Sequence, residues 1–172
     1  MLATAGELHR ELRFEFIGPV DADVEPALRA AVAAGHVTWS GFVPNDEALS
    51  RLDGAMAGLS LVHPQPNHAG SLQTKVLEYL SRRVPVVTSD LAVTGPFVRE
   101  HEVGLTVPPY DAQATISALR RLRDHRTARV AMADRGFGLV CDELNWEQAG
   151  ERFVGQLMEW ADVGLPTGDA DR

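Results

Sequence analysis

The residue types best suited to chemistry lie in one stretch of the chain, between His63 and Glu78. Lys75 is the only lysine, and Glu78 follows it at a spacing of three residues. In a helix these two side chains share a face. A lysine can bind a diphosphate as a compact positive charge, and a carboxylate can accept hydrogen bonds from the two hydroxyls of a ribose. The pair is a candidate nucleotide site, with an exposed intrahelical ion pair as the simpler interpretation.

The segment before this pair has the composition of a ligand-binding loop. It holds His63, His68 and Ser71 among several Pro, Gly and Asn residues, between a strand pattern and a helix pattern. Backbone N–H groups near Gln73 and Thr74 would open the helix, where the helix dipole favours an anion. The two histidines lack the Cys or carboxylate companions of a metal site, so we expect no metal and place His63 in the pocket lining.

Short apolar runs alternate with helical patterns along the whole chain. This alternation predicts an α/β fold, a Rossmann-like doubly wound parallel sheet with a helical C-terminus. We expect one Rossmann-like domain, residues 1–162, followed by a flexible tail, residues 163–172. Strands are expected at residues 12–17, 36–40, 58–62, 84–88 and 104–107. Helices are expected at residues 24–34, 73–82, 96–101, 111–124, 127–140 and 145–162, with another capped by Asn45 or Asp46.

Composition excludes several classes of function. The formal net charge of -8 disfavours binding to nucleic acid. Arginines between positions 120 and 135 are interpreted as solvated helix faces, with weak peripheral membrane contact as the alternative. Cys141 is the only cysteine and cannot form an internal disulfide. With no signal peptide pattern and no transmembrane run of about 18 apolar residues, we expect a cytoplasmic protein.

Several segments, in order, resemble family 4 retaining glycosyltransferases. The stretch Ser71–Leu80 (SLQTKVLEYL), followed by VPVV at residues 84–87, is similar to the family's small-Leu-Pro-x-Lys-x-x-Glu-Tyr segment and Pro-Val-Val strand. Further matches are FIG at residues 16–18, VTWSGFV at 37–43, GLTVP at 104–108 with Asp111, and Asn145-Trp146. The resemblance covers about residues 12–160, and the ordered series is more specific than any single match.

This resemblance implies a GT-B architecture, in which two Rossmann-like domains face each other across a cleft. The chain would be the C-terminal, donor-binding half. Glu78 would bind the ribose, and the backbone amides of Gln73 and Thr74 would bind the phosphates or the sugar, with Lys75 nearby. The base would lie against one loop, Gly41, Phe42 and Val43, and the same pocket would include His63, Gly70 and Ser71. Transfer would retain configuration, without metal or any cofactor besides the nucleotide-sugar donor.

Three departures from the family pattern argue against activity of the isolated chain. Gly70 stands where the family's Glu-x7-Glu motif has its first acidic residue, which commonly faces the donor sugar. Arg83 replaces the usual glycine before the Pro-Val-Val strand. The first strand of the domain, the Arg/Lys pair that usually grips the diphosphate, and the acceptor-binding N-terminal domain have no counterpart in these residues. The chain therefore resembles an N-terminally truncated enzyme.

The missing strand predicts a physical cost. In a sheet ordered 3-2-1-4-5-6 the first strand is central, so its absence leaves two interior strand edges with unpaired backbone groups. We expect the isolated chain to be marginally stable, prone to aggregation, or completed by another polypeptide.

The leading hypothesis is a glycosyltransferase domain that binds the donor for transfer of a hexosyl group to an acceptor held elsewhere. The alternative is a non-catalytic nucleotide-binding or interaction module that retains the fold. A sugar-nucleotide epimerase shares the architecture, but the Lys-x-x-Glu-Tyr segment favours a transferase.

Overall fold

A computed structural model describes residues 1–162. Met1–Phe137 forms one compact unit and Gly138–Arg172 belongs to a second, so each is described by itself. The described strands are β1 (Glu15–Phe16), β2 (Thr38–Trp39), β3 (Gly58–Ser60), β4 (Val86–Ser89) and β5 (Gly104–Val107). The helices are α1 (Leu2–Leu8), α2 (Glu25–Ala33), α3 (Asn45–Ser50), α4 (Pro66–Ala69), α5 (Thr74–Ser81), α6 (Thr94–Glu100), α7 (Ala112–Asp124), α8 (Arg126–Asp142) and α9 (Trp146–Asp162). The predicted tail, residues 163–172, lies outside the described residues.

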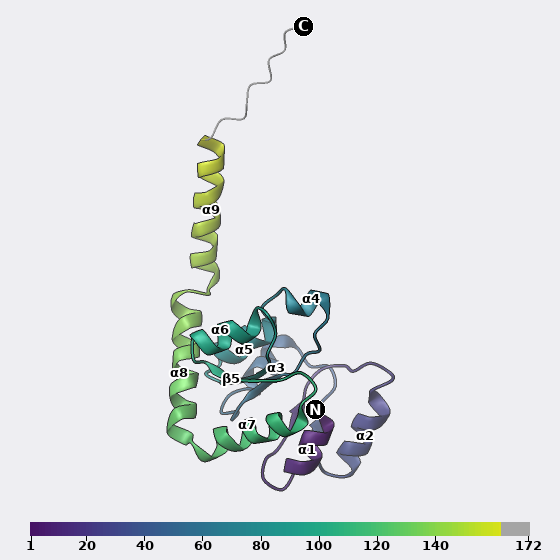
Figure 1. Ribbon diagram of the computed structural model, residues 1–172. Helices are drawn as coiled ribbons and strands as arrows, with labels where there is room; N and C mark the ends of the chain where they lie inside the picture. Colours follow the sequence, from purple (N-terminus) through teal and green to yellow (C-terminus); the bar gives the residue numbers. More distant parts are fainter. Residues whose placement is uncertain (163–172) are drawn as a thin grey trace. The chain divides into compact units, whose positions relative to one another are not determined.

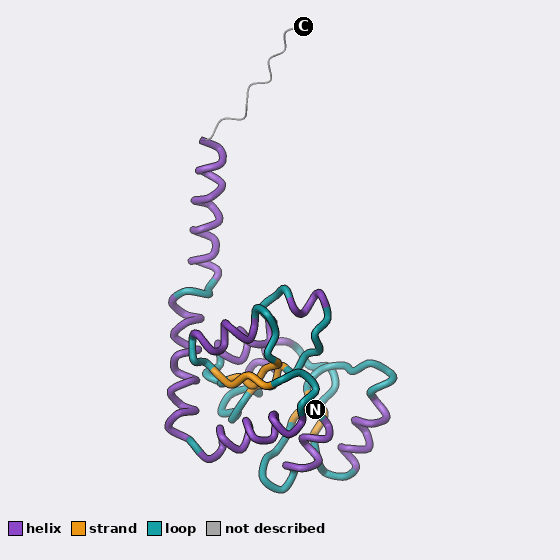
Figure 2. The backbone as a smooth tube through the Cα atoms, viewed as in Figure 1, coloured by secondary structure: helices purple, strands orange, loops and turns teal. Residues whose placement is uncertain are grey.

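The strands pair in parallel, as the sequence predicts, but they form two sheets (Figure 2). One sheet pairs β1 with β2, and the other has the order β3-β4-β5. In the first, Phe16 lies opposite Trp39; in the second, Val87 lies between Leu59 and Leu105. Within the described residues, β1, β2, β3 and β5 therefore each have one edge without a strand partner, and β4 is paired on both edges.

Helices cover the strands of the first unit on both sides (Figure 1). α5 packs on β3 and β4, and α6 packs on β4 and β5. α7 packs on β4 and β5 and also contacts α1, which in turn contacts α2. Every residue of β4 is buried, which explains its continuous apolar and β-branched sequence.

One hydrophobic core joins the two sheets. Phe14 and Val37 lie in or beside the β1–β2 sheet, and Val87 belongs to the other sheet. They share a cluster with the buried residues Leu8 and Leu119 of α1 and α7. The two sheets are thus held together by helix packing on one side and not by backbone pairing.

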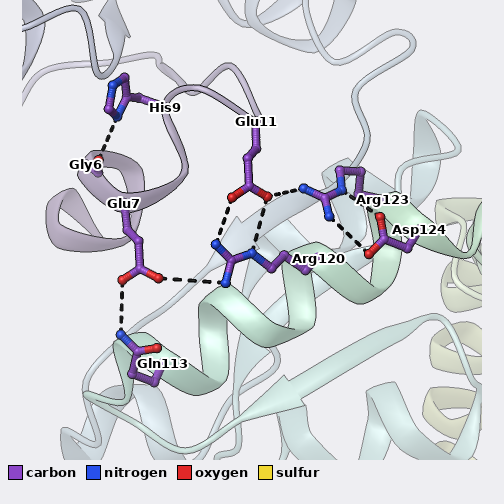
Figure 3. A network of polar contacts seen from close by, with 8 residues as sticks. All are labelled: Gly6, Glu7, His9, Glu11, Gln113, Arg120, Arg123 and Asp124. Atoms are coloured by element: carbon purple, nitrogen blue, oxygen red, sulfur yellow. Dashed lines mark hydrogen bonds and ion pairs between the residues drawn. The ribbon is translucent and has the colours of Figure 1, made fainter.

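A polar network also connects the N-terminal segment to α7 (Figure 3). Glu11, which follows α1, accepts hydrogen bonds from Arg120, at 2.8 Å, and from Arg123. Glu7 of α1 accepts one from Gln113 at 3.1 Å. The bond from Arg120 is the main cause that lowers the pKa of the Glu11 carboxyl from its ordinary value of 4.5. Four of the arginines expected on solvated faces, at 120, 123, 129 and 135, also bond to carboxylates or carbonyls of the first unit.

The observed boundaries differ from the prediction where local signals were weak. β1 and β2 are shorter than predicted, and α1 and α4 were not predicted. The expected cap at Asn45 or Asp46 is wrong, because Pro44 takes the N-cap position and its carbonyl accepts the N–H of Ala48 at 2.9 Å. Asp111 does cap α7, by accepting the N–H of Ala114 at 2.8 Å.

Arg83 lies in a backbone conformation that favours glycine. Its φ is 55°, and it follows α5 in the position where helices commonly end with a left-handed residue. The N–H groups of Arg83 and Val84 bond to the carbonyls of Leu80 and Tyr79, which completes this C-terminal motif. The guanidinium lies 2.5 Å from the Asp134 carboxylate and 4.0 Å from the centre of a phenylalanine ring, that of Phe137. These contacts offset the backbone strain.

Replacing Arg83 by glycine or by alanine separates these effects. Both variants lose the guanidinium contacts, but only alanine retains the strain of the left-handed conformation, roughly 1–2 kcal/mol. We expect Arg83→Gly to be more stable than Arg83→Ala by about 1 kcal/mol in urea unfolding, the reverse of the usual order of these residues in helices. Equal stabilities would show that the backbone relaxes at this position.

The Glu11 network predicts a pH-dependent contribution to stability. A carboxyl whose folded pKa is lowered stabilises the fold above its unfolded pKa and loses that contribution as pH falls through the folded pKa. We expect the difference in Tm between wild type and Glu11→Gln to be largest near neutral pH and to shrink below pH 4.5. Glu100→Gln, which removes an exposed carboxylate outside the network, is the control. A difference independent of pH would contradict the assignment.

Candidate functional site

The sequence-predicted site begins at the carboxyl end of β3. The chain leaves β3, passes through α4 and enters α5 at Thr74. Val76 and Leu80 are fully buried, and they fix the rotation of α5 on the sheet. Lys75 is consequently exposed and Glu78 half-buried, one turn apart on the other side of the helix.

Side-chain hydrogen bonds hold the loop before α5 in place. The Gln73 side-chain amide donates to the carbonyls of His68, at 3.0 Å, and Ser71, at 3.1 Å. The Ser71 hydroxyl donates to the Asn67 carbonyl at 2.9 Å, and the Thr94 hydroxyl donates to the Ser71 carbonyl at 3.3 Å. Gln73 therefore fixes the loop with its side chain. If Gln73 binds a phosphate, it does so with its backbone N–H.

The N-terminus of α5 has no side-chain cap. Gln73 occupies the N-cap position without a capping hydrogen bond from its side chain, while its carbonyl accepts the N–H of Val76 at 2.9 Å. The N–H groups of Thr74 and Lys75 lie in the first turn, where a helix offers no acceptor. These donors point beyond the helix end and can bind an anion there.

Lys75 and Glu78 are not bonded to each other. Among residues 1–162, no ion pair joins them, so the intrahelical pair that a three-residue spacing also permits is not formed. Nearby Arg51, in contrast, bonds to Glu47 at 2.5 Å and to Glu15 at 3.0 Å. The charges of Lys75 and Glu78 therefore remain available to a ligand.

Two aromatic residues near the loop were not predicted. The Tyr110 ring stacks on His63 with 4.4 Å between ring centres, and Tyr110 is 73% exposed. Tyr79 donates its hydroxyl hydrogen to the Leu59 carbonyl at 3.2 Å. Burial raises the pKa of Tyr79, which keeps the hydroxyl protonated as a donor. The sequence signal for Tyr110 is an aromatic residue in the Pro-Pro-Tyr turn after β5, at the same edge of the sheet.

The predicted base-contacting loop lies beside the end of β1. Gly41 has a φ of 64°, and its carbonyl accepts the N–H of Gly18 at 2.6 Å. Phe42 is 81% exposed and Val43 is half-buried. Within the described residues, no hydrogen bond or ion pair connects this loop to α5. The structure thus places the predicted residues from His63 to Glu78 on one loop and the helix that follows it, and places Gly41–Val43 on the loop between β2 and α3.

Gly70 has room for a side chain. Its φ is -93°, which any residue can adopt. A Cβ atom built there meets only the Pro66 carbonyl oxygen, at 3.8 Å, which is ordinary van der Waals contact. The glycine is thus not required by the backbone or by packing.

A family model described as glycosyl transferases group 1 matches residues 1–125. The chain belongs to this family. An alpha-D-kanosaminyltransferase from Streptomyces kanamyceticus is 26% identical over 148 residues, which are 86% of this chain and 36% of the relative. This glycosyltransferase chain therefore spans about a third of the length of that curated relative.

Solved structures share the fold of this glycosyltransferase chain. Sucrose-phosphate synthase from Thermosynechococcus elongatus matches with a TM-score of 0.75 and 19% identity, over 95% of this chain and 43% of that one. Anabaena HepE, solved in complex with UDP, matches with a TM-score of 0.74 and 11% identity, over 91% of this chain and 44% of that one. The parallel α/β fold is therefore that of GT-B glycosyltransferases.

None of the helices within residues 1–162 of the glycosyltransferase chain is long and apolar enough to cross a membrane. In the same residues, no group of three or more His, Cys, Asp or Glu side chains is placed to hold a metal ion.

Proposed function

We propose that this glycosyltransferase domain binds a nucleoside diphosphate sugar at the N-terminus of α5, for retaining transfer of the hexosyl group. Glu78 accepts hydrogen bonds from the ribose hydroxyls, and Lys75 with the first N–H groups of α5 binds the diphosphate. The acceptor is held by a separate domain or by a complementing chain, so the isolated chain does not catalyse transfer.

The observation that carries this proposal is the unpaired state of Lys75 and Glu78 beside an uncapped helix N-terminus. In open α/β sheets, ligands bind beyond the carboxyl ends of the strands, and this helix starts there. The family membership supports a sugar donor, and the solved relative with bound UDP supports a nucleoside diphosphate.

The chemistry needed from this half of the site is electrostatic. When the glycosidic bond to the phosphate breaks, negative charge develops on the diphosphate leaving group. Fixed N–H dipoles and a nearby ammonium stabilise that charge more than they stabilise the bound donor. No metal or further cofactor is needed in this scheme, because Lys75 and the N-terminus of α5 supply the positive potential.

A non-catalytic nucleotide-binding module is the second candidate. Gly70 favours it, because the position that commonly contacts the donor sugar in the family carries no side chain. The two candidates share the nucleotide site and differ in whether the sugar is recognised.

A double-mutant cycle tests the nucleotide site. One change alters Glu78 in the protein, and the other removes the ribose hydroxyls from the ligand. Wild-type chain is titrated calorimetrically with UDP, GDP and ADP, and then with the 2′,3′-dideoxy form of the best binder. Loss of hydrogen bonds to a carboxylate should weaken binding roughly tenfold or more. In Glu78→Gln the preference for the ribo over the dideoxy form should shrink, because a neutral amide oxygen accepts weaker hydrogen bonds from the hydroxyls than a carboxylate does.

Glu100→Gln is the matched control, since it removes an exposed carboxylate at the end of α6, and it should leave both affinities unchanged. Lys75→Gln should lower the affinity for the nucleoside diphosphate roughly tenfold, and it should lower the affinity for the corresponding nucleoside monophosphate less. An undiminished preference for the ribose in Glu78→Gln would refute the site.

Gly70→Glu tests recognition of the sugar. A Cβ atom at this position meets no clash, and a carboxylate there should accept hydrogen bonds from the donor's hydroxyls. We expect the affinity for the nucleoside diphosphate hexose to rise roughly tenfold relative to the nucleoside diphosphate alone. Gly70→Ala, measured in the same titration, should show no such gain. An equal effect on both ligands would mean that the sugar does not lie beside residue 70.

A further inference from the structure

Two loops meet beyond the end of β4, through a pair of stacked rings. His63 comes three residues after β3, and Tyr110 comes three residues after β5. β4 lies between these strands, and the two rings stack with 4.4 Å between their centres and 38° between their planes. Because the strands are parallel, both loops lie at the carboxyl edge of the sheet, where α5 also begins. The stack therefore shares an edge of the sheet with the nucleotide site.

The backbone at Tyr110 favours a different residue. Asp111 donates its N–H to the Pro108 carbonyl at 3.3 Å, which closes a turn with Pro109 and Tyr110 at its centre. The φ of Tyr110 is 65°. Proline followed by a residue of positive φ is the pattern of a type II turn, in which the second central residue is normally Gly or Asn. A tyrosine is strained there, and such strain is concentrated at functional sites.

The Tyr110 ring is held in place and still open to solvent. One face of the ring packs on His63, yet Tyr110 is 73% exposed, so the opposite face is free. Pro108 and Pro109 restrict the backbone before it. The backbone after it is held by Asp111, which caps α7 by accepting the N–H of Ala114 at 2.8 Å. The result is an exposed aromatic surface of fixed orientation.

A series of contacts connects this ring to the start of α5. The His63 carbonyl accepts a hydrogen bond from Nδ1 of His68 at 3.2 Å. The His68 carbonyl accepts one from the side-chain amide of Gln73 at 3.0 Å, and Gln73 is the N-cap residue of α5. Gly70 lies within the loop that these bonds close. The Tyr110 ring, the loop and the helix start are therefore positioned by one another.

The order of groups in a nucleoside diphosphate hexose determines which group lies near this ring. With the ribose at Glu78 and the diphosphate at the first N–H groups of α5, the ligand runs toward the start of the helix. The hexose, attached to the second phosphate, then lies beyond that start, over the loop with His63 and Gly70. The base is attached to the ribose and lies on the side away from the diphosphate. The hexose is thus the group that reaches Tyr110.

An aromatic face suits a hexose ring chemically. A hexopyranose carries C–H groups on its faces and most of its hydroxyls around its rim. The face of an aromatic ring is electron-rich and attracts polarised C–H groups, and the contact removes apolar surface of both rings from water. Such a contact leaves the rim hydroxyls free for other partners and does not need a carboxylate at residue 70.

We propose that Tyr110 is a platform for the hexose ring of the donor and that His63 positions it. The proposal rests on the proposed function and extends it, because it assigns recognition of the sugar to a residue outside the segment from His63 to Glu78. Tyr110 supplies the contact that the chain lacks at Gly70. A module that binds only the nucleotide has no use for such a platform.

The first test compares nucleoside diphosphates with and without a hexose. UDP and UDP-glucose, GDP and GDP-mannose, and ADP and ADP-glucose are titrated calorimetrically into the full chain. Tyr110→Ala should lower the affinity for the ligands with a hexose roughly fivefold and leave the affinity for the bare diphosphates unchanged. Tyr110→Phe keeps the aromatic face and should bind both kinds of ligand like wild type.

Variants of His63 test its positioning role by the same comparison. His63→Ala removes the support of the Tyr110 ring and should lower the affinity for the ligands with a hexose about twofold, with no effect on the bare diphosphates. His63→Phe retains a ring and should restore the affinity. The His63 carbonyl, which holds His68, is present in both variants.

Tyr110→Gly separates loss of the ring from loss of stability. Glycine adopts a φ of 65° without strain, so Tyr110→Gly should unfold at a higher urea concentration than Tyr110→Ala. Both variants lack the ring and should show the same roughly fivefold loss for the ligands with a hexose. A loss that followed stability would mean that the geometry of the turn, and not the ring, recognises the sugar.

NMR tests the contact directly, because the chain has only two tyrosines, Tyr79 and Tyr110. Isotopically labelled tyrosine gives two sets of ring signals, and Tyr110→Phe identifies those of Tyr110. With a ligand that carries a hexose bound, we expect nuclear Overhauser effects between the Tyr110 ring and the C–H protons of the hexose. Tyr79 is the internal control and should show none, since its hydroxyl is bonded to the Leu59 carbonyl and its ring lies over Gly58.

Several results would overturn the proposal. An equal loss of affinity for both kinds of ligand in Tyr110→Ala would mean that the ring does not distinguish the hexose. Contacts of the Tyr110 ring with base protons of UDP, GDP or ADP would assign it to the base, and no contact with any of the three hexoses would exclude a platform. If the bare diphosphates bind through Glu78 while Tyr110 has no effect, only the platform fails. If they do not bind, the proposed function fails and the platform with it.

Discussion

The fold depends on the requirement that every backbone group buried in a sheet has a partner. β4 meets this requirement on both edges, through β3 and β5, and all its residues are buried. β3 meets it on one edge only, yet it carries the loop that leads to α5. The position of the candidate site therefore follows from the pairing of β3 with β4, and the open edge of β3 is the weak point of that arrangement.

α5 combines several roles in eight residues. Val76 and Leu80 are fully buried, and Tyr79 reaches back to the open edge of β3. The Tyr79 ring occupies the space that a side chain at position 58 would need: a Cβ on Gly58 would lie 2.2 Å from it. Lys75 is exposed and Glu78 half-buried because Val76 and Leu80 turn the packed face of the helix away from them. A change that moves Tyr79 would therefore also rotate α5 and displace Lys75 and Glu78.

The sequence predicted the features that local patterns determine. The continuous apolar run before Ser89 indicated a strand buried on both faces, and Asp111 indicated the start of α7. The cap at Asn45 was wrong because Pro44 competes for the same position. α1 was not predicted, since its residues 2–8 (LATAGEL) carry a weak apolar pattern and pack against α2 and α7, which lie later in the chain.

The candidate site likewise has a part that local sequence patterns determine and a part that depends on the fold. Residues from His63 to Glu78 are continuous in the chain, so their grouping on one loop and helix followed from the sequence. The stacking of Tyr110 on His63 joins residues far apart in sequence and needed the fold. The sequence identified Arg83 as a departure from a family glycine, but only its φ of 55° gives the physical meaning of that glycine.

The distribution of charge limits where an anion can bind. A chain of net charge -8 repels anions on average, so a diphosphate can bind only where the local potential is positive. Arg51 and Lys75 line one hollow of the first unit, but Arg51 is neutralised by Glu47 and Glu15. Lys75 and the N–H groups of α5 therefore remain as local sources of positive potential.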